Sequence, residues 1–118
     1  PSEEHFDTIT LKCPDIITDI SPVKSAINGA KRMHPNAKIC VNCHMMSNIQ
    51  NILSDIQCLT LRLTSAQDFD DFLHMDNQLA PSDMQNKELI LLVNDTVQID
   101  GIKPEELPLL WTIQKLPA

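Results

Sequence analysis

The chain has 118 residues, of which 42% are hydrophobic, so it can form one domain around a single core and is not expected to be disordered. Its 16 acidic and 9 basic side chains give a formal charge of -7, which opposes binding to nucleic acid or to an anionic membrane, because affinity for phosphate groups comes largely from Lys and Arg. With two glycines it cannot build a glycine-rich phosphate loop, and no apolar run approaches the ~20 residues that cross a bilayer.

Segments with the periodicity of strands and of helices alternate from the N-terminus. Residues 7–13 alternate polar and apolar side chains, which predicts a strand with one buried face. Residues 21–33 are predicted to form a helix, since Ser21 is a typical N-cap and Pro22 is typical of the first helical position. Residues 38–46 alternate again and predict a second strand.

The middle of the chain repeats this order. Residues 47–56 predict a short helix with four apolar residues on one face, and residues 58–64 predict a strand. Residues 64–79 predict a third helix, whose acidic first turn suits the positive end of the helix dipole. Residues 80–86 are expected to form a loop, and residues 87–93, which are apolar on both faces, to form a central strand covered on both sides.

The C-terminal part is less regular. Asn94 and Asp95 are turn residues and predict a hairpin into residues 96–102, whereas Pro104 is expected to begin a last helix. Strands that alternate with helices favour a parallel sheet with crossover helices. We therefore predict an α/β fold for residues 1–118, as a single domain with one mostly parallel or mixed sheet. Because the sequence starts with proline, we expect it to be a fragment of a larger chain.

Cys40, Cys43 and His44 have the C-x-x-C-H spacing by which a c-type haem is attached. Residues 28–46 around them resemble the start of a class I cytochrome c. This resemblance implies haem c bound through the two thiols, with His44 as its axial ligand and electron transfer as the function. The strands predicted for residues 58–64 and 87–93 disagree with the all-helical fold of that family.

Residues 38–46 also fit a strand without any cofactor, in which every second residue from Ile39 faces the core. A structural zinc site would need further ligands beside Cys40 and Cys43. The scattered candidates for such ligands are Cys58, His34, His44 and His74. A redox dithiol would need its first cysteine at a helix N-terminus, where the pattern does not place it. We therefore interpret the segment as a strand and expect no cofactor or metal, with haem c as the alternative.

Four units of the chain begin with a strand pattern, at Ile9, Ile39, Leu59 and Leu89. Over about residues 7–97 these units, ITLKCPDI, ICVNCHMM, LTLRLTSA and LILLVNDT, resemble irregular leucine-rich repeats, in which a short strand is followed by a helix. Asn94 stands where that family has a structural asparagine. The resemblance implies a strand-helix array that serves as a surface for recognising proteins.

The expected function is non-catalytic protein-protein interaction, as an adaptor domain in an intracellular assembly. Four cysteines are too few for a disulfide framework, so we expect free thiols and a location in the cytoplasm or nucleus. No catalytic combination of residues stands out. Asp68, Asp70 and Asp71 would attract a partner with a basic surface, and Trp111 could anchor an interface.

Overall fold

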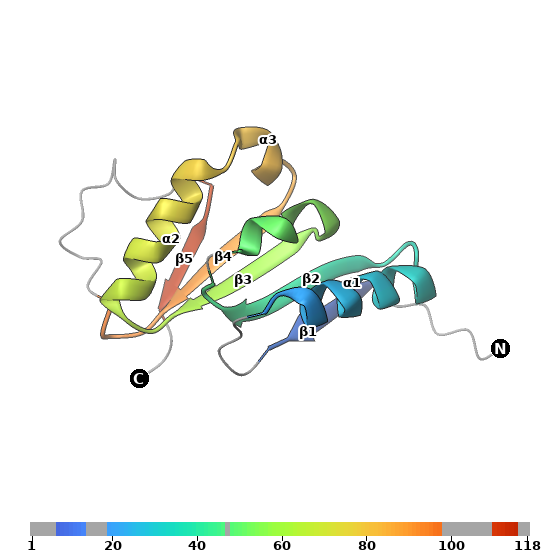
Figure 1. The fold of residues 1–118 in the computed structure, drawn as a ribbon, viewed down its shortest axis with the longest axis horizontal. Coiled ribbons are helices and arrows are strands. Elements are labelled where there is room, and N and C mark those ends of the chain that lie inside the picture. The colour runs from blue at the N-terminus through green and yellow to red at the C-terminus, as the bar shows by residue number, and fades with distance from the viewer. Residues whose placement is uncertain (1–6, 14–18, 47, 98–109, 116–118) are drawn as a thin grey trace.

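The computed structural model describes residues 7–13, 19–46, 48–97 and 110–115, in which strands and helices follow one another along the chain (Figure 1). In chain order the elements are β1 (Thr8–Lys12), α1 (Ser21–Met33), β2 (Lys38–His44), the 3-10 turns η1 (Ile49–Asn51) and η2 (Leu53–Asp55), β3 (Cys58–Leu63), α2 (Ala66–Gln78), α3 (Pro81–Met84), β4 (Glu88–Val93) and β5 (Thr112–Lys115). The five strands form one all-parallel sheet, which confirms the predicted α/β fold.

The strands lie in the sheet in chain order, β1-β2-β3-β4-β5. Their register sets apolar residues side by side, and one such row consists of Leu11, Val41, Leu59 and Leu89. Crossover connections between parallel strands share one hand, so a sheet wound in a single direction collects its helices on one face. Figure 1 shows α1, the two 3-10 turns and α2 on the same side of the sheet.

The core lies between the sheet and these helices. In β2, β3 and β4 every second side chain is buried: Ile39, Val41, Cys43, Leu59, Leu61, Leu63, Leu89, Leu91 and Val93. The helices add Val23, Ile27, Phe69, Phe72 and Met75. The strand predicted for residues 38–46 is thereby confirmed over its main part. On the other face of β4 the side chains of Ile90 and Leu92 are half-buried, so the cover predicted for that side is only partial.

The two long helices begin where local chemistry favours it. The helix predicted for residues 21–33 is confirmed, but Ser21 is its first residue rather than its N-cap, and the Ser21 N–H donates to Asp19 Oδ1 at 3.0 Å. At the start of α2 the Ser65 hydroxyl accepts a hydrogen bond of 3.1 Å from the Asp68 N–H. This side-chain bond satisfies one of the backbone donors that a helix start leaves unpaired.

Two predicted segments of the middle region differ in the structure. Instead of one α-helix, residues 48–56 form the 3-10 turns η1 and η2. Their four apolar residues are nevertheless buried as predicted: Ile49, Ile52, Leu53 and Ile56. The predicted loop 80–86 contains the short helix α3, whose start is held by a 2.9 Å bond from the Ala80 N–H to Asp83 Oδ2.

The last helix predicted from the sequence is wrong in the part that the structure describes. Residues Thr112–Lys115 form strand β5, in which Ile113 pairs with Leu91 of β4. The β-branched Thr112 and Ile113 suit a strand, and pairing with a buried neighbour outweighs the local helix pattern. The start of that predicted helix and residues 98–102 of the predicted hairpin lie outside the described residues.

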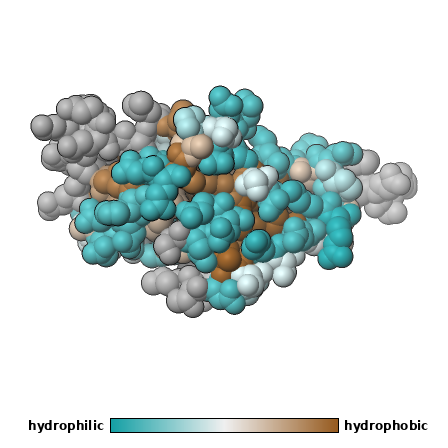
Figure 2. Space-filling model, turned by 45° about the horizontal axis from the view of Figure 1, so that its top comes forward, coloured by the Kyte–Doolittle hydropathy of each residue, from teal (hydrophilic) through white to brown (hydrophobic). Residues whose placement is uncertain are grey.

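Polar residues make up much of the surface of the described part of the chain that is visible in one view (Figure 2). Figure 2 shows hydrophilic side chains over most of the visible surface, with hydrophobic atoms in a narrow band among them. No helix in the described part of the chain is long and apolar enough to cross a membrane.

Candidate functional site

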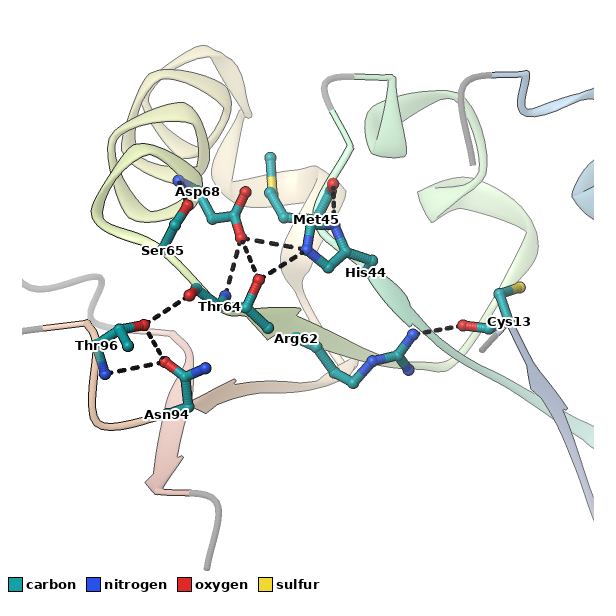
Figure 3. A network of polar contacts seen from close by, with 9 residues as sticks. All are labelled: Cys13, His44, Met45, Arg62, Thr64, Ser65, Asp68, Asn94 and Thr96. Atoms are coloured by element: carbon teal, nitrogen blue, oxygen red, sulfur yellow. Dashed lines mark hydrogen bonds and ion pairs between the residues drawn. The ribbon is translucent and has the colours of Figure 1, made fainter. Parts of the chain in front are cut away.

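In open α/β sheets ligands bind outside the carboxyl ends of the strands, at the point where the strand order reverses. The order β1-β2-β3-β4-β5 has no such reversal, but the carboxyl end of this sheet holds a polar network. His44 is the last residue of β2, Thr64 follows β3, and Asn94 follows β4. Figure 3 shows these side chains in one network, which also includes Asp68 from α2 and Thr96. These residues form the candidate for a catalytic site.

The contacts of His44 decide against nucleophilic catalysis. Its Nδ1 lies 3.0 Å from the Met45 carbonyl oxygen, and its Nε2 lies 3.2 Å from Thr64 Oγ1 and 3.2 Å from Asp68 Oδ2. A catalytic triad places the carboxylate on the imidazole nitrogen opposite the hydroxyl. Here both groups lie at Nε2, and the Thr64 hydroxyl also lies 3.0 Å from Asp68 Oδ2 as its hydrogen-bond donor. The arrangement therefore lacks the relay that would activate Thr64.

The hydrogen bonds of the same network connect the ends of the strands to α2. Asp68 Oδ2 accepts a 2.9 Å bond from the Thr64 N–H, and the Thr96 hydroxyl donates to the Thr64 carbonyl oxygen at 2.6 Å. The side chains of His44 and Asp68 are 12% and 16% exposed. Asp68, which the sequence proposes as a partner-binding residue, thus holds the start of α2 and has little surface to offer.

The other proposed partner-binding residues lie in different surroundings. Asp70 and Asp71 are exposed on α2. Trp111 is buried, with its ring edge-on to Phe72 at a centroid distance of 4.9 Å, and its indole N–H donates to Asp76 Oδ1 at 3.0 Å. Of the proposed residues, Asp70 and Asp71 are therefore available at the surface, whereas Trp111 belongs to the core.

Cys40 and Cys43 lie on opposite faces of the sheet, because they are three residues apart in β2. Cys43 is 0% exposed among core residues, and this burial raises the pKa of its thiol to about 12. Cys40 is half-buried on the face away from the helices. Thioether bonds to one planar haem need both thiols on the same side, so these residues do not fit haem c. Among the described residues, no group of three or more His, Cys, Asp and Glu side chains could hold a metal ion.

The face of the sheet opposite the helices is the larger candidate site, and we call it the open face. Its side chains are Thr8, Thr10, Lys12, Lys38, Cys40, Asn42, Cys58, Thr60, Arg62, Glu88, Ile90, Leu92, Thr112 and Gln114. Each of them is exposed or half-buried. Within the described residues, the helices pack on the other side of the sheet.

Arg62 lies near the end of the middle strand β3, and its side chain extends toward Cys13 (Figure 3). Its Nη1 donates to Asn42 Oδ1 at 2.7 Å and its Nη2 donates to the Cys13 carbonyl oxygen, so the guanidinium reaches across β2 toward the end of β1. Both acceptors are neutral, and no carboxylate of the described residues forms an ion pair with Arg62. With no acidic partner among the described residues, a half-buried guanidinium retains donors that suit a carboxylate from outside.

Charge is distributed unevenly over the molecule. The open face carries three cationic residues, Lys12, Lys38 and Arg62, and one acidic residue, Glu88. Helix α2 carries four acidic residues and neither lysine nor arginine: Asp68, Asp70, Asp71 and Asp76. The open face is therefore net positive in a protein whose formal charge is -7, as is helix α1, which carries Lys24, Lys31 and Arg32 and no acidic residue.

Two thiols also meet on the open face. The register places Cys40 directly beside Cys58, and the Cys58 thiol donates to Glu88 Oε2 at 3.4 Å. Burial first, and then the neighbouring Cys40 and Glu88, raise the pKa of Cys58 to about 12. The Cys58 thiol is therefore protonated at neutral pH, which disfavours it as a nucleophile.

The sequence does not predict the contacts of Arg62 or the pairing of Cys40 with Cys58. The strand pattern does place Arg62 on the outward side. The neighbours of these residues come from other strands, and the register that brings them together follows from the fold. Comparisons with protein-family models, with curated proteins and with solved structures found no match to this chain.

Proposed function

We propose that this chain is a non-catalytic protein-interaction domain that binds its partner through the open face. The observation that carries this proposal is the one-sided sheet, in which five strands lie in chain order and the helices pack on one side. Arrays of strand-helix repeats share this arrangement and use the exposed side of the array as a binding surface. It supports the role as an adaptor that the repeat resemblance implies.

The chemistry of the open face fits an acidic protein surface. Ile90 and Leu92 provide half-buried apolar contacts, and Arg62 lies in register beside Leu92. Apolar groups next to an arginine are typical of the centre of a protein interface. Lys12 and Lys38 are exposed and would speed the encounter with an acidic partner. A nucleic acid is a poorer fit, because the protein as a whole is acidic.

The open face is small, which limits the affinity that it can supply. Five strands at a spacing of about 4.8 Å and about five residues of 3.3 Å each cover roughly 400 Å². In a standard interface each partner buries about 800 Å². A contact confined to this face is therefore expected to be weak and transient.

The exposed Asp70 and Asp71 support a second candidate surface, on α2. A partner with a basic surface, as the sequence suggests, would bind there by charge complementarity. The two surfaces call for partners of opposite charge, so one experiment separates them.

The experiment places a photo-crosslinking residue at Thr112 on the open face or at Asp71 on α2, in the protein expressed in cells. The cross-linked partner is then purified and its affinity is measured by calorimetry against two matched charge reversals. Lys12→Glu with Lys38→Glu should weaken binding at least tenfold, because it turns the open face acidic. Asp70→Lys with Asp71→Lys should leave the affinity unchanged.

If only the substitutions at Asp70 and Asp71 weaken binding, the partner binds α2 and has a basic surface. If neither pair of substitutions changes the affinity, charge complementarity on either surface is refuted. Circular dichroism of both variants checks that the fold is retained, which is expected because all four side chains are exposed.

A further inference from the structure

Strand β1 forms one edge of the sheet, and its outer backbone groups have no partner among the described residues. The Lys38 N–H donates to the Asp7 carbonyl oxygen, and the Cys13 N–H donates to the Asn42 carbonyl oxygen, both at 2.8 Å. In a parallel pair, alternate residues of a strand bond to the same neighbour. The residues at the other alternate positions of β1 therefore direct their N–H and C=O groups away from β2: Thr8, Thr10 and Lys12.

Two hollows run along this edge, between β1 and α1. The first measures about 420 Å³ and lies at the start of β1, where Ile9, Ala30 and Met33 line it. The second measures about 320 Å³ and lies at the end of β1, where its lining includes Leu11, Pro22 and Ala26. Met33 stands out beside the first hollow with 76% of its surface exposed. An apolar edge with unpaired backbone groups is a template for another strand.

We propose that this edge pairs with the β1 edge of a second copy of the chain, antiparallel and across a twofold axis at Thr10. The outward backbone groups of the two strands would then bond to each other. Thr10 would face its own copy, Thr8 would face the partner's Lys12, and Ile9 would face the partner's Leu11. Threonine pairs and apolar pairs stabilise neighbouring strands, and no two like charges stand directly opposite.

The hollows fit the same axis, which favours a second copy over an unrelated strand. Because α1 runs back along β1, its end lies at Thr8 and its start lies at Leu11. The twofold axis therefore brings the exposed Met33 of one copy to the second hollow of the other. An exposed apolar side chain thus meets an apolar hollow twice in one symmetric contact.

The remaining side chains of α1 permit this approach. A Cβ atom added at Gly29 would meet nothing within 4 Å, so open space lies beside the helix at this level. Lys24 and Lys31 lie on the side of the helix opposite Met33, at 100° per residue. Their positive charges therefore point away from the partner helix.

Sedimentation of the 118-residue protein tests the proposal, and the expected mass is twice the 13.3 kDa of the chain. Thr10→Pro removes an outward N–H without removing a bond to β2, and Met33→Glu places a charge at the second hollow. Each should weaken the dimer at least tenfold. Leu110→Glu is the matched control, since Leu110 is the other large apolar side chain that is exposed in the described chain, and it should change nothing.

Hydrogen exchange identifies the interface. The amides of Thr8, Thr10 and Lys12 should be protected at high protein concentration and should lose this protection on dilution. A protein that stays monomeric at high concentration would refute the proposal. So would a dimer that survives Met33→Glu, or one in which these three amides exchange as freely as in the monomer.

Discussion

Substitution of Phe72 tests how tightly α2 packs in the core beneath it. The Phe72 side chain is fully buried, lies edge-on to Trp111 at 4.9 Å, and stacks at 16° on Phe69 with a centroid distance of 6.4 Å. Replacing Phe by Ala in a core costs about 3–5 kcal/mol, because apolar contacts are lost and a cavity remains. The edge-on pair itself contributes about 0.5–1.5 kcal/mol beyond the buried area. We expect Phe72→Ala to cost about 4 kcal/mol of unfolding free energy.

Such a loss is large for a chain of this size. At about 0.05–0.15 kcal/mol per residue, 118 residues give a total stability of roughly 6–18 kcal/mol. A urea titration measures it, because Trp111 is the single tryptophan and its fluorescence reports the packing around Phe72. With a slope of about 1–3 kcal/mol per molar urea, the midpoint should fall by roughly 1.3–4 M.

Two further variants make the result specific. Phe72→Leu keeps most of the apolar volume, so it should cost less than Phe72→Ala. Leu110→Ala changes a side chain that is 53% exposed and should stay within about 0.5 kcal/mol of the natural protein. A cost below about 1 kcal/mol for Phe72→Ala would refute the tight packing of Phe72 against Phe69 and Trp111.

Three other predictions concern the cap, an acid and a thiol. Ser65→Ala removes the hydroxyl that caps α2 and should cost about 1 kcal/mol in the same titration; an unchanged midpoint would contradict the cap. Burial raises the pKa of Asp76, so its protonated form stabilises the fold below the ordinary value of 3.8 and this contribution is lost as pH rises through the folded pKa. Asp76→Asn should therefore raise the melting temperature at pH 7 but not below pH 3.8, and an equal gain at both would contradict this. Cys43, with its pKa raised to about 12 by burial, should react with a thiol reagent no faster than the protein unfolds, as alkylation followed by mass spectrometry can measure.

The sequence predicts the central strands well because their burial is one-sided. Alternation in residues 38–46 and 58–64 reflects one face against the helices and one face open, which a period of two records directly. The C-terminal strand is not predicted from the sequence, because it depends on pairing with a strand far away in the chain. Thr112–Lys115 is short and pairs with β4, so a local pattern led by Pro104 suggests a helix instead.

The candidate site is predicted less well than the fold, since it depends on register. The alternation places Arg62 on the outward side of its strand, but its acceptors, Asn42 Oδ1 and the Cys13 carbonyl, come from elsewhere in the chain. The C-x-x-C-H spacing, in contrast, suggests a haem site that the positions of the two cysteines do not support. A strand sends Cys40 and Cys43 to opposite faces, whereas a helix or loop could present both thiols together.

The strand order of the sheet connects the two proposals, which are partner binding through the open face and pairing of two copies at β1. The same chain order that collects the described helices on the other face also ends the sheet at β1, with an edge that another strand can extend. A twofold axis perpendicular to the sheet would keep both open faces on the same side. Two faces of roughly 400 Å² would then approach the ~800 Å² that a partner buries in a standard interface. A partner with two acidic segments would gain avidity over the single face, and Met33→Glu should remove this gain while leaving the affinity of each face unchanged.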